Sequence, residues 1–190
     1  RTFADGRLRN VYWGGGDLAD ADGHARLAAW YDAAQPAWRE DAYAAESHAG
    51  NLAWAALALT EAAVTLAPGP TADAARQAAG QLLDWIESRL RADDALGGYY
   101  GGLAGADASQ ARLEWRSTEH NLDVAAAAAR LHALTAEPRF QAMAAHARQF
   151  VNQTFDERRG HYWTGTAADG SLNRDVIPLD VQAWAALADP

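Results

Sequence analysis

Residues 115–123, WRSTEHNLD, place many reactive groups directly before an alanine-rich apolar stretch. Glu119 and Asp123 are four residues apart, so on a helix both carboxyl groups face the same side. Two neighbouring carboxyl groups can act as an acid and a base when their surroundings push their pKa values apart. Trp115 can desolvate Glu119 and raise its pKa, which makes Glu119 the first candidate for a general acid. Asp123 would lie inside an apolar helix and needs a partner, for which Arg116 is one candidate.

A purely structural explanation covers part of this segment. Its hydroxyl and amide side chains can cap the helix by accepting hydrogen bonds from free backbone N–H groups. Glu119 is favoured beside the positive end of the helix dipole, and the same holds for Asp180 in the first turn of a later helix. Capping does not explain Trp115, His120 and Asp123 together, so these three residues carry the functional interpretation.

The segment is the middle one of three similar loop-to-helix junctions. An aromatic pair followed by Gly or Thr-Gly recurs three times, and each pair precedes, after a polar loop, an alanine-rich helix start. Leu52, Leu122 and Leu179 take matching places in these helices, at spacings of 70 and 57 residues. The aromatic pairs are Tyr12 and Trp13, Tyr99 and Tyr100, and Tyr162 and Trp163, and the helix starts span 50–59, 120–131 and 179–188.

The stretches between the junctions predict a second set of helices. Residues 71–92 and 137–155 carry apolar side chains at helical spacing, and Pro138 suits a first helical turn. The junction helices are apolar almost all the way round, so they must be buried on most faces. This pattern predicts an all-α fold of αα-hairpin repeats that form an α/α toroid, complete or partial; an ordinary helical bundle is the alternative. We expect one domain, or a fragment of one, over residues 1–190, with hairpin units near 45–95, 117–156 and 178–190.

In these features the chain resembles the (α/α)6-toroid, or six-hairpin glycosidase, superfamily, without pointing to one subfamily. The resemblance implies a central cleft at the inner-helix N-termini that binds an oligo- or polysaccharide. It also implies catalysis by Asp or Glu, usually in a hydrolase and sometimes in a lyase or an epimerase. Only three hairpin starts are present, so the missing remainder of a longer chain is an expected partner. The segments that carry the resemblance are 99–102, 117–123, 162–163 and 177–184.

The resemblance implies a glycoside hydrolase with two carboxyl groups across the scissile bond. Such groups lie about 5–5.5 Å apart for retention and about 6.5–9.5 Å apart for inversion. Glu119 is then the general acid, with Asp180 or Asp123 as its partner. Flat aromatic rings beside glycine can stack on sugars, or they can fill the hairpin junctions as core residues. The substrate-binding candidates are Trp13, Glu46, His48, Tyr100, Trp115, His120, Asn121 and Trp163.

Two other functions remain open at this stage. A sugar epimerase or isomerase on the same architecture would use His120 and His48 as acid and base. A non-enzymatic α-solenoid would instead bind a partner on its concave face.

The composition of the chain restricts the ligands and cofactors that we expect. The 190 residues carry a formal charge of −9, which argues against nucleic-acid binding and suits a neutral or cationic glycan, although a local patch can reverse that preference. No segment predicts a membrane span. Cysteine is absent and no HExxH or P-loop occurs, so we expect no metal and no cofactor. The compartment stays open, with an extracellular or periplasmic location favoured.

Overall fold

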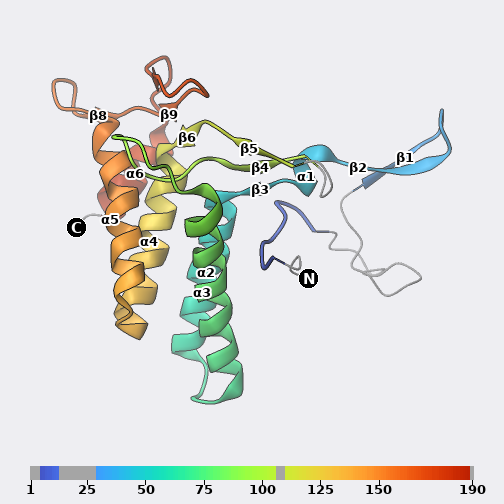
Figure 1. The fold of residues 1–190 in the computed structure, drawn as a ribbon, viewed down its shortest axis with the longest axis horizontal. Helices are drawn as coiled ribbons and strands as arrows, with labels where there is room; N and C mark the ends of the chain where they lie inside the picture. The colour runs from blue at the N-terminus through green and yellow to red at the C-terminus, as the bar shows by residue number, and fades with distance from the viewer. Residues whose placement is uncertain (1–4, 13–28, 106–109, 189–190) are drawn as a thin grey trace.

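The computed structural model describes residues 5–12, 29–105 and 110–188. The long helices lie side by side, and short strands and loops gather at one end of them (Figure 1). The helices are α1 (Ala42–Ala45), α2 (Ala49–Thr65), α3 (Pro70–Leu90), α4 (Thr118–Thr135), α5 (Pro138–Gln153) and α6 (Leu179–Ala188).

Two antiparallel helix hairpins form the body of the structure. α2 packs against α3, and α4 packs against α5. Proline occupies the first turn of both α3 and α5, where its missing N–H costs no helical hydrogen bond. α4 ends at Ala136, whose left-handed backbone (φ 58°) turns the chain toward α5. These hairpins confirm the predicted fold class.

The hairpins are arranged with the alanine-rich helices inside. α4 lies between α2 and α6 and contacts both. Small side chains along α2 and α4, among them Ala53, Ala56, Ala127 and Ala128, are fully buried and allow this close approach. The amphipathic helices α3 and α5 complete the core with larger residues: Leu82, Leu83, Ile86, Leu90, Phe140, Met143 and Phe150.

Within the described ranges, short antiparallel strands form four small sheets. β3 (Ser47–His48), β4 (Gly102–Ala104) and β5 (Ala111–Leu113) make one sheet, and β6 (Arg116–Ser117), β9 (Gly165–Thr166) and β10 (Leu172–Asn173) make another. The remaining two are hairpins: β1 (Ala29–Asp32) with β2 (Ala37–Glu40), and β7 (Phe155–Asp156) with β8 (His161–Tyr162). The sequence analysis predicted loops, not strands, around the aromatic pairs, and made no prediction for β1 and β2.

Candidate active site

The strands bring the N-termini of the inner helices to one end of the structure (Figure 1). β3 leads directly into α2, and β6 leads directly into α4. The backbone of Gly101 joins these two starts, because its carbonyl accepts from Ala49 N (3.0 Å) and its N–H donates to Trp115 O (2.7 Å). The junctions that the sequence related as repeats are therefore neighbours in space.

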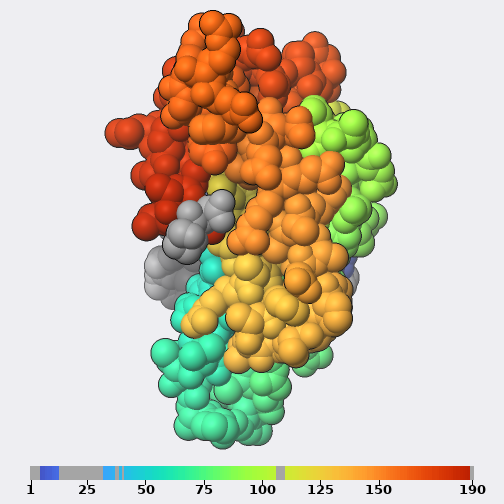
Figure 2. Space-filling model, turned by 90° about the vertical axis from the view of Figure 1, so that its left-hand side faces the viewer, coloured from blue at the N-terminus to red at the C-terminus, as the bar shows by residue number. Residues whose placement is uncertain are grey.

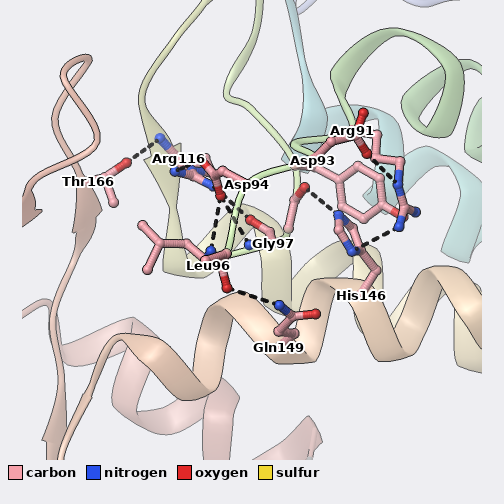
Figure 3. A network of polar contacts seen from close by, with 12 residues as sticks. Arg91, Asp93, Asp94, Leu96, Gly97, Arg116, His146, Gln149 and Thr166 are labelled. Atoms are coloured by element: carbon pink, nitrogen blue, oxygen red, sulfur yellow. Dashed lines mark hydrogen bonds and ion pairs between the residues drawn. The ribbon is translucent and has the colours of Figure 1, made fainter.

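The loop that carries the middle aromatic pair is held by a polar network (Figure 3). Arg116 is 2% exposed and donates to both carboxylate oxygens of Asp94 (2.7 and 2.8 Å) and to the carbonyl of Gly97 (2.8 Å). On the other side, His146 Nε2 lies 3.0 Å from Gly98 O, and its Nδ1 faces Arg91 Nη2 at 3.1 Å. The network fixes the loop against α5.

This network corrects one prediction. Arg116 was a candidate partner for Asp123, but its guanidinium is committed to Asp94. The hydrogen bonds from Arg116 hold the pKa of the Asp94 carboxyl below its usual range, although partial burial opposes the shift. Arg116 therefore supports the loop and leaves Asp123 without a cationic partner in the described part of the chain.

An imidazole and aromatic cluster lies at the starts of α2 and α4. His48 Nε2 is 2.8 Å from Glu46 Oε2, and both side chains are largely buried. The His120 ring lies 5.9 Å from the His48 ring and 5.5 Å from the Trp115 ring, measured between centroids. Burial, and secondarily the charge of His48, lowers the pKa of His120 to about 4, so its ring is neutral near pH 7. Its Nδ1 is buried and has no hydrogen-bond partner among the described residues.

Asp123 lies one turn further along α4 and is 5% exposed. Burial first, and then the charge of Glu119, raises the pKa of its carboxyl to about 7, while the Trp54 indole acts in the opposite direction. Its Oδ2 is buried and accepts no hydrogen bond from any described residue. A carboxyl group that is buried without a hydrogen-bond donor holds a proton far more readily than an exposed one.

Gly50 allows α2 to approach His120 and Asp123 this closely. A methyl group built at Gly50 would lie 2.5 Å from His120 Cδ2 and 3.1 Å from Asp123 Oδ2. Any side chain at this position would therefore displace the His120 ring. Gly50 and Trp54 are parts of the site that the sequence analysis did not single out.

Glu119 connects the middle junction to the third. It is partly exposed in the first turn of α4, and burial, followed by the charge of Asp180, raises the pKa of its carboxyl. Asp180 is exposed in the first turn of α6. Glu119 thus influences Asp123 on one side and is influenced by Asp180 on the other, which places three carboxyl groups from two inner helices in electrostatic contact.

The remaining residues that were predicted to bind the substrate are buried, are partly covered by another side chain or lie outside the described residues. Asn121 is fully buried, and its amide binds the backbone of Tyr99 in both directions (2.8 and 3.1 Å), so it locks the loop and does not face a cleft. The guanidinium of Arg112 lies 4.1 Å from the Tyr100 ring centroid and covers one face of that ring. Trp163 is only 5% exposed, which leaves no open stacking face. Trp13 lies outside the described residues.

In the described part of the chain, no group of three or more His, Asp or Glu side chains is placed to hold a metal ion. No helix among the described residues is long and apolar enough to cross a bilayer.

The fold is similar to those of three solved sugar-active proteins, all of the α/α-toroid type. The first is a GH76 alpha-mannanase from Bacteroides thetaiotaomicron, with TM-score 0.53, 17% identity, and coverage of 67% of this chain and 34% of the mannanase. The second is a sugar epimerase from a ruminal bacterium, with TM-score 0.57, 11% identity, and coverage of 72% and 34%. The third is a D-mannose isomerase, with TM-score 0.55, 14% identity, and coverage of 83% and 38%.

These likenesses establish an α/α-toroid type of fold. The chain spans about a third of the length of each of the three proteins. No known family profile matches the chain, and no curated protein matches it.

Proposed function

We propose that the chain is part of a carbohydrate-active enzyme, and that it contributes acid and base groups to glycoside hydrolysis. The observation that carries this proposal is the series of carboxyl groups Asp123, Glu119 and Asp180 at the inner-helix N-termini, with the pKa raised at the first two. Hydrolysis of a glycosidic bond needs one protonated and one ionised carboxyl group in the same site. The gradient of burial along this series supplies that difference.

Glu119 is the proposed general acid. It is exposed enough to reach a substrate, and its raised pKa favours the protonated form that can donate to the leaving oxygen. Asp180 is the proposed partner because its side chain is exposed at the start of the neighbouring helix and its charge acts on Glu119. Asp123 is the alternative partner; its burial suits it better to storing a proton than to direct attack.

The remaining candidates are proposed to bind the sugar. Trp115 is partly exposed beside His120 and can offer an aromatic edge or face to a sugar ring. Glu46 and His48 form a polar pair that can exchange hydrogen bonds with hydroxyl groups.

Substitution of the carboxyl groups tests the hydrolase proposal. We expect Glu119→Gln to reduce the release of reducing ends by at least about 100-fold, since general acid catalysis contributes about 10²–10⁴-fold. Asp84→Asn on the outer surface of α3 is the matched control and should retain full activity, since Asp84 pairs with the exposed Arg139 and lies outside the candidate site. Full activity of Glu119→Gln would contradict the assignment.

A second function is supported by a separate observation. His48, oriented by Glu46, and the neutral His120 lie with their ring centroids 5.9 Å apart, and such a pair can remove and return a proton beside a carbonyl. Two of the three similar structures are named as a sugar epimerase and an isomerase. We propose sugar epimerisation or isomerisation as the alternative activity.

One experiment separates the two activities. Incubation with candidate sugars in D2O should leave carbon-bound hydrogen unexchanged if the enzyme hydrolyses, but should introduce deuterium beside the carbonyl if it epimerises. Loss of exchange in His120→Ala, with exchange retained in Glu119→Gln, would establish the alternative. Sugar binding without turnover in either assay would leave the non-enzymatic binding module as the function.

A further inference from the structure

A hollow lies outside the carboxyl series, in the segment that follows α5. It has a volume of about 490 Å³, and its lining includes Phe155, Trp163 and Leu172 as well as three arginines: Arg158, Arg159 and Arg174. This segment gathers at one end of the molecule, beyond the end of α5, in the orange and red part of Figure 2. The hollow therefore lies at the same end as the inner-helix N-termini (Figure 1).

The charge of this hollow contrasts with that of the chain. Three guanidinium groups face two carboxylates, Asp156 and Glu157, in a protein whose formal charge is −9. Asp156 is already engaged, because its Oδ1 accepts from the backbone N–H groups of Arg158 (3.0 Å) and Arg159 (3.2 Å) and its Oδ2 lies 3.5 Å from Arg159.

Two of the arginines are available to a ligand. Arg158 and Arg174 are exposed and make no ion pair with another described residue. A guanidinium group presents a planar fork of N–H donors that matches a carboxylate. The hollow thus has unused donors for an anionic group.

Part of the lining of the hollow is apolar. Phe155 is exposed and Leu172 is half-buried, so both can present hydrocarbon surface, whereas Trp163 is buried and lies near Arg159, whose guanidinium carbon is 5.9 Å from its ring centroid. Apolar surface next to cations favours a ligand that has both a hydrocarbon face and an anionic edge. A uronic acid unit has this form, because its carboxylate is attached directly to the sugar ring.

We propose that this hollow binds a uronic acid unit of a glycan. The ring lies against Phe155 and Leu172, and Arg158 and Arg174 bind the carboxylate. The choice of a sugar as the ligand rests on the proposed function, whereas the preference for a carboxylate rests on the arginines alone.

The hollow is joined to the candidate active site by two hydrogen bonds. The hydroxyl of Thr118 donates to Trp163 O (2.6 Å), and the backbone N–H of Thr118 donates to Thr164 O (2.9 Å). Thr118 immediately precedes Glu119 in the first turn of α4. A glycan unit held in the hollow would therefore lie against the segment that fixes the start of α4.

Calorimetric titration tests the proposal with a matched pair of ligands: an oligosaccharide of uronic acid units and its neutral, carboxyl-reduced counterpart. We expect the acidic ligand to bind at least 10-fold more tightly, and the Arg158→Gln/Arg174→Gln variant to lose this difference. Arg76→Gln, a surface arginine of α3 paired with Asp73, is the control and should bind as the unsubstituted protein does. Thermal unfolding of each variant verifies that it is folded.

Three results would overturn the proposal: equal binding of the two ligands, undiminished binding by the double variant, or preferential binding of a sulfated neutral oligosaccharide. Binding is also measured in Glu119→Gln, which leaves the hollow intact. Uronate binding that persists in this variant shows that the hollow acts independently of hydrolysis. Conversely, the unsubstituted protein could bind both ligands equally and still hydrolyse neutral glycans. That result would reject the proposed uronate site and leave the proposed function standing.

Discussion

Gly50→Ala provides a quantitative test of how closely α2 meets the catalytic candidates. The added methyl group would lie 2.5 Å from His120 Cδ2, a distance that requires the ring or the helix to move. Gly80→Ala in α3 is the matched control, because its methyl group would meet Phe140 Cζ at 3.6 Å and Arg139 Nη2 at 3.7 Å, which are ordinary contacts. Both glycines are helical and buried.

The two substitutions are expected to change the free energy of unfolding in opposite directions. Replacing a helical glycine with alanine stabilises a protein by about 0.5–1 kcal/mol when the methyl group fits. Overpacking a tight site costs about 1–3 kcal/mol. We therefore expect Gly80→Ala to raise the free energy of unfolding slightly, and Gly50→Ala to lie about 1–3 kcal/mol below Gly80→Ala.

Urea unfolding followed by tryptophan fluorescence measures both variants. A double variant, Gly50→Ala with His120→Ala, should recover part of the loss because it removes the ring that the methyl group meets. If Gly50→Ala is as stable as Gly80→Ala within about 0.5 kcal/mol, a difference smaller than the cost of overpacking, then His120 does not pack against Gly50 as described. The geometry of the candidate site would then need revision.

Three further predictions concern the groups around the site. Asp94→Asn should lower the free energy of unfolding by about 1–3 kcal/mol, as measured in urea, because it removes the negative charge paired with the buried Arg116 guanidinium and one of its two carboxylate acceptors. The raised pKa of Asp123 means that its contribution to stability is present at low pH and is lost as the pH rises from about 4 to about 7; Asp123→Asn should remove this component from a pH series of unfolding curves, and an unchanged series would contradict it. Thr118→Val should cost about 1–2 kcal/mol and increase amide exchange around Trp163, since it removes a buried hydrogen bond.

The helical framework was predictable because it depends on local periodicity. The predicted segments 71–92 and 137–155 became α3 (Pro70–Leu90) and α5 (Pro138–Gln153). Each has a single apolar stripe and a proline at its start, and both signals are contained within the segment itself. The fold class followed because apolar inner helices need an outer layer.

The strands were not predictable by the same reasoning. β3, β6 and β9 have only two residues each, too few to show an alternating pattern. They form because glycine permits close backbone pairing: a methyl group at Gly165 would lie 2.0 Å from Arg116 O, and one at Gly102 would lie 2.2 Å from Ser47 O. Such contacts join segments distant in sequence and leave no local signal.

Arg116 shows the same limit for side chains. Its guanidinium pairs with Asp94, which is 22 residues earlier in the chain, rather than with Asp123. Asp94 lies in an irregular loop whose position depends on α5, through Gln149 and His146. Sequence spacing could suggest that Asp123 needs a partner, but it could not identify which elements meet there.

The polar and titratable side chains at the start of α4 lie on two faces of the helix. Thr118 and Asn121 are three residues apart, share a face, and are fully buried in hydrogen bonds to loop backbone. Glu119 and Asp123 share another face by the four-residue spacing, and His120 reaches the same region as Asp123 beside Gly50. The first face fixes the loops, and the second retains titratable groups with shifted pKa values. The start of α4 therefore both fixes the loops of the candidate site and supplies its acids. A substitution on the first face should alter catalysis by moving the loops, whereas a substitution on the second face should alter catalysis by removing a titratable group.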